Sequence, residues 1–270
     1  MSDEIIVPGR AFEEKVIEAD NYSIRYVEAG LGPSIISLHG ANGFRLSRTH
    51  DMLAESHRVI VIEAPGFGAS EVNNRAQNME DLAVSIIAVT EALGLQEINI
   101  MGMSFGGKLA LACAILRPEI VRSAILIAPA AIRPEQAPED IPTHAQRAAA
   151  LFAHPERQPP PTHLSEEIIA KQEDLVSRTI GPGRDPLFET KLAELKVPVL
   201  ALFGTEDILI PPEIGRYYTE IIPTCFSVMV YDAAHAIDAD RPEAVTELVS
   251  DFVKRRGDFI VRDVDDTIHP

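Results

Sequence analysis

Gly102-Met103-Ser104-Phe105-Gly106-Gly107 is the stretch of this chain from which its fold is predicted. A short, mostly apolar run, 98–101, leads into it, and a run of helix-forming residues, 108–116, follows it. The pattern G-x-S-x-G between a strand and a helix is typical of a sharp turn that lifts the serine hydroxyl clear of the sheet. The glycines two positions before and after the serine lack side chains, so the strand and the helix can approach closely. The stretch therefore predicts a strand, a tight turn and a helix, with Ser104 as a candidate nucleophile.

The same stretch overlaps a second motif, the phosphate-binding loop. Residues 102–108 fit the pattern G-x-x-x-x-G-K, which also joins a strand to a helix. That motif continues with Ser or Thr, whose hydroxyl binds magnesium, but the residue here is Leu109. The phosphate motif is incomplete and the serine turn is complete, so an ATP-binding protein is the weaker hypothesis.

Short apolar runs alternate with helical patterns along the chain. Near the N-terminus, polar and apolar residues alternate on both sides of Asp20-Asn21, which predicts an antiparallel hairpin over 14–19 and 23–28. The later strands are short, mostly apolar runs, typical of a parallel sheet buried on both faces. They are expected at 34–38, 58–62, 98–101, 123–128, 197–203 and 226–230, with helices at 79–93, 108–116 and 242–255. The pattern predicts an α/β fold with a mostly parallel sheet and helices on both faces.

The character of the chain changes at Pro129. Prolines are frequent from Pro134 to Pro161, and no strand pattern returns before residue 197. Helical runs are expected at 145–152, 165–179 and 186–195. We therefore predict a helical cap, residues 131–195, inserted into a core of residues 1–130 and 196–270. The polar tail 258–270 carries no recognisable function.

Composition argues against several classes of function. The chain has 270 residues, of which 46% are hydrophobic, enough for one large domain with an insertion. Its net charge of -17 disfavours binding to nucleic acid and to anionic membranes. The two cysteines, Cys113 and Cys225, are far apart and predict neither a disulfide nor a metal site. No signal peptide or membrane-spanning apolar run is apparent, so we expect a cytoplasmic monomer or homodimer without cofactor or metal.

A base and an acid that could activate Ser104 stand further along the chain. A serine hydroxyl becomes a strong nucleophile when a histidine takes its proton and an acid orients that histidine. Asp207 follows the expected strand 197–203, and His235 follows the expected strand 226–230. In a sheet of this kind, ligands bind beyond the carboxyl ends of the strands. The chain order Ser, Asp, His at these ends predicts a catalytic triad.

With these residues in place, the sequence resembles the α/β-hydrolase family, in its branch of serine esterases and meta-cleavage-product hydrolases. The resemblance extends over nearly the whole chain. It depends on His39-Gly40, Gly102 to Gly107, Gly204-x-x-Asp207, and Ala234-His235 followed by Arg241-Pro242-Glu243. It implies an eight-stranded-type sheet, Asp207 as the catalytic acid, and an oxyanion hole formed by the backbone N–H groups of Ala41 and Phe105.

Two positions depart from the family pattern. Glu63 stands where the family loop begins with Asp, and we interpret this as a structural variation. Ala236 follows the candidate base, where members that cleave carbon–carbon bonds often carry Trp or another aromatic residue. This difference weakens carbon–carbon bond cleavage as a hypothesis without removing it. Ser104 argues against the dehalogenases and epoxide hydrolases of this fold, because their nucleophile is Asp.

The sequence thus predicts a serine hydrolase that cleaves carboxylic esters of small to medium size through an acyl-enzyme on Ser104. A carbon–carbon bond hydrolase of the meta-cleavage-product type and a non-catalytic ligand-binding protein remain as alternatives. We expect His39 to hold the oxyanion loop by hydrogen bonds, and Lys108 to face solvent or neighbouring loops. The expected substrate-binding side chains are those of Asn42, Phe44, Ile132, Phe152, Ile208 and Ile237.

Overall fold

The protein is described from a computed structural model. The structure describes residues 6–133, 143–160, 163–259, 261–262 and 267–268. Two proline-rich pieces of the predicted cap, 134–142 and 161–162, and parts of the polar tail lie outside the described residues.

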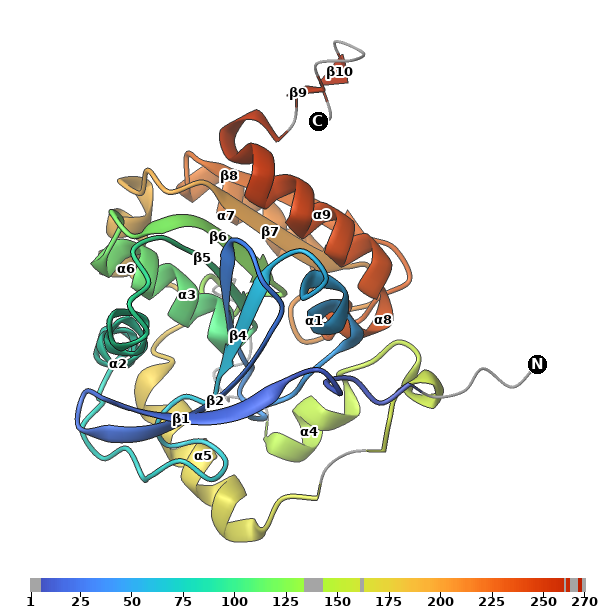
Figure 1. Cartoon of the computed structure of the whole chain (residues 1–270). Coiled ribbons are helices and arrows are strands. Elements are labelled where there is room, and N and C mark those ends of the chain that lie inside the picture. Colours follow the sequence, from blue (N-terminus) through green and yellow to red (C-terminus); the bar gives the residue numbers. More distant parts are fainter. Residues whose placement is uncertain (1–5, 134–142, 161–162, 260, 263–266, 269–270) are drawn as a thin grey trace.

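An eight-stranded sheet forms the centre of the molecule (Figure 1). Its strands lie in the order β1-β2-β4-β3-β5-β6-β7-β8. β2 pairs antiparallel with β1 and β4, and the other neighbours pair in parallel, which confirms the predicted α/β fold. The strands are β1 (Glu13–Ala19), β2 (Tyr22–Ala29), β3 (Ser34–Leu38), β4 (Arg58–Ile62), β5 (Ile98–Met103), β6 (Val121–Ile127), β7 (Val199–Gly204) and β8 (Cys225–Val230).

Burial along the strands depends on their place in the sheet. All residues of β7 are buried, whereas in β1, at the sheet edge, Ala19 alone is buried. A strand covered on both faces can be apolar throughout, while an edge strand leaves one face and one side to water. The apolar runs of the sequence therefore mark the parallel strands, and among them β8, at the opposite edge of the sheet, has Val230 alone buried.

Helices cover both faces of the sheet. Figure 1 shows α2 (Met79–Ala92) and α3 (Phe105–Leu116) on one side and α1 (Arg48–Leu53) and α9 (Pro242–Arg255) on the other. α9 has the predicted bounds. The sequence pattern does not predict α1, α7 (Gly215–Ile221) or α8 (Ile237–Asp240), because so few residues cannot display a helical period. The remaining short elements are η2 (Pro212–Ile214), η3 (Arg256–Asp258) and the paired strands β9 (Val261–Arg262) and β10 (Thr267–Ile268).

The described part of residues 131–195 contains helices and no strand. The helices are α4 (His144–Ala149), η1 (Pro155–Arg157), α5 (Glu166–Thr179) and α6 (Pro186–Ala193). Ser165 precedes α5 as its N-cap, and its hydroxyl accepts from the Ile168 N–H. Asp185 is the N-cap of α6, and its carboxylate accepts from two N–H groups. α6 packs against α3 and α7. Residues of α4 and α5, by contrast, line the cavity described below.

Candidate active site

Ser104 lies at the turn between β5 and α3 in a strained backbone conformation. Its φ is 53° and its ψ is −113°, a region that costs a residue with a side chain about 1–3 kcal/mol. The Ser104 N–H donates to the Ile127 carbonyl at 2.8 Å, and the Ser104 carbonyl accepts from the Gly107 N–H at 2.9 Å. A Cβ on Gly102 would lie 2.0 Å from the Gly106 carbonyl oxygen, so only glycine fits there. The G-x-S-x-G stretch therefore forms the sharp turn that its glycines permit.

His235 and Asp207 form a buried hydrogen-bonded pair. His235 Nδ1 lies 2.8 Å from Asp207 Oδ2, and the two side chains are 4% and 0% exposed. The other carboxylate oxygen of Asp207 accepts from the N–H groups of Leu209 (2.8 Å) and Ile210 (2.9 Å). An ionised carboxylate only accepts hydrogen bonds, so this contact places a proton on Nδ1 and leaves Nε2 as the acceptor.

The other acids near His235 are bound elsewhere. Asp232 Oδ1 lies 2.8 Å from Nε2 of His154, and Asp238 accepts from the guanidinium of Arg45 at 2.9 Å. Glu206, next to Asp207, is exposed. Among these four carboxylates, Asp207 is therefore the one that the fold brings to the imidazole of His235.

Ser104 and His235 line one cavity of about 1550 Å³. The loop that follows β3 forms one part of its wall, and α4 and α5 contribute another. Asp207 does not line this cavity and reaches it only through His235. Phe44 and Phe152 are among the apolar residues of the lining, and Arg45 and Arg147 also line the cavity.

The loop that follows β3, in which the oxyanion hole is predicted, is held in place through the carbonyl of Gly40. That carbonyl accepts from the Gly43 N–H at 3.0 Å and lies 2.9 Å from His39 Nδ1. The Ala41 N–H belongs to the same trans peptide group and therefore points in the opposite direction. Ala41 lines the cavity, whereas Phe105 begins α3 and lies beside it. Among the described residues, neither of their N–H groups donates to a protein acceptor.

His39 is a neutral hydrogen-bonding residue of this loop. Its Nε2 accepts from the Ala64 N–H at 3.2 Å, so its proton lies on Nδ1 and is donated to the Gly40 carbonyl. Burial lowers the pKa of His39 below its usual range. This structural arrangement agrees with the role expected for His39.

The predicted pocket residues divide into two groups. Asn42, Phe44 and Phe152 line the cavity, and Asn42 Oδ1 accepts from Arg147 Nε at 2.7 Å. The other three, Ile132, Ile208 and Ile237, do not line it, which corrects the expectation. The side chains of Ile132 and Ile237 are fully buried in the core, and Ile208 is 79% exposed at the surface. The sequence indicates that these residues are apolar but not where they point.

A polar network in the wall of the cavity was not predictable from the motifs. Arg45 Nη2 bonds to Asp238, and His50 Nε2 lies 2.9 Å from the Ser37 hydroxyl. The Ser47 N–H donates to His50 Nδ1 at 3.0 Å. Burial lowers the pKa of His50 to about 4, and although burial opposes it, the charge of Arg45 helps to hold the pKa of Asp238 below its usual range. The only signal in the sequence was the position of Arg45 soon after His39-Gly40.

Lys108 is buried and faces the loop that follows α5, so of its two expected surroundings the neighbouring loop is found and solvent is not. It is 2% exposed, and its Nζ donates to the Ile180 carbonyl at 2.6 Å and lies over the Phe188 ring. Burial lowers the pKa of Lys108 to about 8. Lys108 thus attaches α3 to the C-terminal end of α5. Because its ammonium group is bound there, it is not available as a phosphate ligand.

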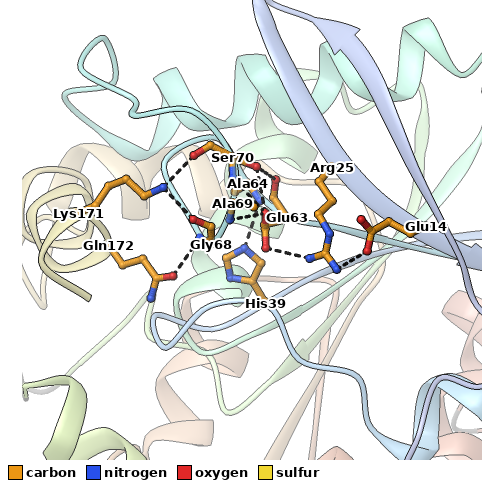
Figure 2. Close-up of polar contacts among 10 residues, drawn as sticks. All are labelled: Glu14, Arg25, His39, Glu63, Ala64, Gly68, Ala69, Ser70, Lys171 and Gln172. Carbon is orange, nitrogen blue, oxygen red and sulfur yellow. Dashed lines mark hydrogen bonds and ion pairs between the residues drawn. The ribbon is translucent and has the colours of Figure 1, made fainter. Parts of the chain in front are cut away.

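Glu63 organises the loop that follows β4 (Figure 2). Its carboxylate accepts from the N–H groups of Ala69 (3.1 Å) and Ser70 (3.2 Å) and pairs with Arg25 at 3.0 Å. Glu63 itself is 2% exposed. The residue that departs from the family pattern therefore has a structural role in the loop.

The described residues contain neither a cluster suited to a metal ion nor a membrane-spanning helix. No group of three or more His, Cys, Asp or Glu side chains in this part of the chain is arranged to bind a metal ion. No helix in it combines the length and the apolar composition that crossing a bilayer requires.

The fold of the chain has counterparts among known proteins. Residues 33–156 match the family model described as alpha/beta hydrolase fold. The chain is therefore an α/β-hydrolase-fold protein, as the resemblance of its motifs implies.

Its relatives include hydrolases of different substrates. The chain is 24% identical over 263 residues to a 2-hydroxy-6-oxononadienedioate/2-hydroxy-6-oxononatrienedioate hydrolase of Burkholderia vietnamiensis, covering 86% of this chain and 91% of that protein. It is 25% identical over 250 residues to a pimeloyl-[acyl-carrier protein] methyl ester esterase of Vibrio atlanticus, covering 82% of this chain and 95% of that protein. The crystal structure of a membrane phospholipase A, a bacterial virulence factor, matches with a TM-score of 0.75 at 22% identity, covering 90% of this chain and 86% of that one.

Proposed function

We propose that this protein is a serine hydrolase that cleaves carboxylic esters of small to medium size through an acyl-enzyme on Ser104. One observation carries the proposal: Ser104, at a strained turn, and His235, bonded to the buried Asp207, line the same cavity. A relative named as a methyl ester esterase supports an ester as the substrate.

The proposed reaction begins with attack of Ser104 Oγ on the ester carbonyl carbon. The hydroxyl proton passes to His235 Nε2, and the electron pair of the carbonyl moves onto its oxygen. When the tetrahedral intermediate collapses, the C–O bond breaks and the alcohol leaves with the proton from His235. A water molecule, deprotonated by His235, then attacks the acyl-enzyme and releases the acid. Asp207 stays ionised and holds His235 in the tautomer that each step requires.

The oxyanion would be bound by the N–H groups of Ala41 and Phe105. Hydrogen bonds to the Gly40 carbonyl hold the peptide group that carries the Ala41 N–H. The Phe105 N–H is at the first position of α3, where a helix has no internal acceptor for it and carries a partial positive charge. One such donor is typically worth about 3 kcal/mol of transition-state stabilisation.

The cavity supports substrates of medium size. Its volume of about 1550 Å³ exceeds the roughly 300–1,000 Å³ typical of small-molecule sites. Phe44 from the core and Leu151 and Phe152 from the segment between β6 and β7 offer apolar surface to an acyl or alcohol chain. The division into a core, 1–130 and 196–270, and a cap, 131–195, is part of this proposal, because it assigns substrate selection to the cap.

A fluorophosphonate probe and p-nitrophenyl esters of increasing acyl length test the function. We expect the wild type to take the label and to hydrolyse the esters, and Ser104→Ala to do neither. Ser177→Ala, on the exposed face of α5, is the matched control and should behave as the wild type. A wild-type protein that takes no label and hydrolyses no ester would refute the proposal and favour a non-catalytic binding role.

A second candidate is a carbon–carbon bond hydrolase using the same three residues. It is favoured by Arg147, which lines the cavity and donates to Asn42, because such a substrate carries a carboxylate that a cation could bind. A relative is named for hydrolysis of a dioate. Ala236, in place of an aromatic residue, argues against this candidate. Turnover of a vinylogous diketone acid faster than of any ester would select it.

A further inference from the structure

We infer that Gln172 is a specificity-determining residue of the proposed hydrolase, and that its side-chain N–H₂ donates a hydrogen bond to an oxygen acceptor on the substrate, apart from the scissile carbonyl. The inference rests on the proposed function, because it names a feature of the ester that the same cavity selects. Nothing in the sequence motifs singles out this residue.

Gln172 is a polar residue on the buried face of α5. The buried residues of this helix are Gln172, Leu175, Val176 and Thr179. The Thr179 hydroxyl donates to the Leu175 carbonyl within the helix. Gln172 is 1% exposed and lines the cavity. A glutamine amide in such a place requires partners for its oxygen and its nitrogen.

The orientation of the amide is determined by its one hydrogen bond. Gln172 Oε1 accepts from the Gly68 N–H at 3.0 Å. A backbone N–H can bond only to an acceptor, so the oxygen faces Gly68 and the N–H₂ group faces the other way. Figure 2 shows the amide nitrogen of Gln172 pointing away from the loop at Gly68. Among the described residues, this buried nitrogen has no hydrogen-bond partner.

The amide lies close to two loops that both line the cavity. One loop carries Gly68, and the other carries Gly43, where a Cβ would lie 2.9 Å from Oε1 and 3.3 Å from Nε2 of Gln172. The Gly43 N–H donates to the Gly40 carbonyl, so this second loop is the one that presents the Ala41 N–H. The unpaired donor is therefore held close to the loop proposed to bind the oxyanion.

The neighbouring residue anchors the helix and keeps the donor in place. Lys171 Nζ donates to the carbonyls of Gly68 and Ser70, each at 2.8 Å (Figure 2). Gly68 is thus bound by both residues, through its carbonyl to Lys171 and through its N–H to Gln172. A donor fixed in this way favours a substrate that places an oxygen acceptor beside it. A hydrocarbon chain at the same place would leave the donor without a hydrogen bond and is therefore disfavoured.

Matched pairs of esters test the inference. In the acyl pair, p-nitrophenyl 4-oxopentanoate is compared with p-nitrophenyl pentanoate. In the alcohol pair, the butanoate ester of 2-methoxyethanol is compared with butyl butanoate. Each pair differs by one oxygen acceptor, and the two pairs show on which side of the ester the acceptor binds. We expect the wild type to prefer the acceptor-bearing ester of at least one pair in kcat/KM.

Two variants distinguish the loss of the hydrogen bond from Gln172 to the substrate from a weaker attachment of α5. Gln172→Met should lower kcat/KM for the preferred ester about tenfold more than for its partner, since one hydrogen bond is lost on one substrate only. Lys171→Met removes the adjacent anchor but keeps the amide and its bond from the Gly68 N–H, so it should reduce the preference less than Gln172→Met does. If thermal denaturation shows that Gln172→Met is poorly folded, Gln172→Glu is used instead. The glutamate keeps an oxygen that accepts from the Gly68 N–H and has a second oxygen where glutamine has its donor nitrogen.

The outcomes are distinct from those of the proposed function. Equal losses on both members of each pair in the Gln172 variants, or no wild-type preference in either pair, would overturn the inference while hydrolysis itself stands. A wild-type protein that neither takes a fluorophosphonate label nor cleaves any of the four esters would overturn the proposed function, and the inference with it.

Discussion

Asp207 and His235 are joined by a 2.8 Å hydrogen bond between Oδ2 and Nδ1, although 28 residues separate them in the chain. Asp207 follows β7 and His235 follows β8, and these two strands are parallel neighbours in the sheet. The carboxyl ends of the two strands therefore bring the acid and the base together, and Ser104 follows β5 at the same edge. The relationship makes the tautomer of His235 depend on one carboxylate.

Replacing Asp207 by Asn should leave the fold intact and remove most of the activity. The amide can donate to Nδ1 and so favours the tautomer with the proton on Nε2, which cannot accept the proton of Ser104. We expect kcat to fall by roughly 10⁴, as in other triads with this substitution. Initial rates on p-nitrophenyl esters measure it. Glu206→Gln, at the exposed adjacent acid, should keep wild-type kcat; if it loses activity and Asp207→Asn does not, the acid has been assigned incorrectly.

A methyl group on Gly102 should strongly destabilise the protein. Its Cβ would meet the Gly106 carbonyl oxygen, a backbone atom that cannot move away without distorting the turn at Ser104, at 2.0 Å. We expect Gly102→Ala to lower the free energy of unfolding by more than about 3 kcal/mol, beyond the usual effect of a single substitution. Gly257→Ala is the control, because no atom lies within 4 Å of its Cβ. Urea unfolding of both variants makes the comparison, and similar midpoints would contradict the close approach.

Removing the charge of Glu63 should loosen the loop that bears Gly68. Glu63→Gln leaves Arg25 without its buried carboxylate and weakens the bonds from Ala69 and Ser70. We expect a loss of about 3 kcal/mol in the free energy of unfolding. Glu13→Gln removes an exposed carboxylate that pairs with Lys15 at 3.3 Å, and should cost less than about 1 kcal/mol. Equal losses for the two variants would show that burial of Glu63 does not matter.

Stability should fall between pH 6.5 and pH 4 because of His50. Burial, with a smaller effect of Arg45, lowers its folded-state pKa from 6.5 to about 4. In this range the unfolded chain binds a proton that the folded protein does not, so acid favours unfolding, and the loss is complete below the folded-state pKa. Over that interval one such group accounts for at most about 3 kcal/mol.

Urea unfolding at several pH values measures this dependence. His50→Gln should be less stable at pH 7, because the bonds of His50 to Ser37 and Ser47 are disturbed, but its stability should depend less on pH between 6.5 and 4. If the free energy of unfolding of His50→Gln depends on pH as strongly as that of the wild type, the dependence arises from other groups.

The local pattern of the chain was enough to predict the sheet and its strand ends. Apolar runs such as 199–203 are buried strands because parallel strands are covered on both faces, and Gly102 and Gly106 are recognisable because only glycine allows their approach. Short helices such as α1 and α8 were not predicted, because they are too short to show a repeating pattern of apolar residues. The bounds of elements with strong local signals, α9 among them, could be read from the sequence.

What the sequence by itself determined is thus the fold and the order of Ser104, Asp207 and His235, because these depend on spacing and on residue type. Only the tertiary structure decided which side chains face the cavity. Ile132 and Ile237 are buried in the core and Ile208 is at the surface, although all three are apolar residues close to the expected site. The donor of Gln172 and the ion pair of Arg45 with Asp238, 193 residues away, exist only through contacts between distant segments. The direction and burial of a side chain are properties of those contacts, and no local pattern records them.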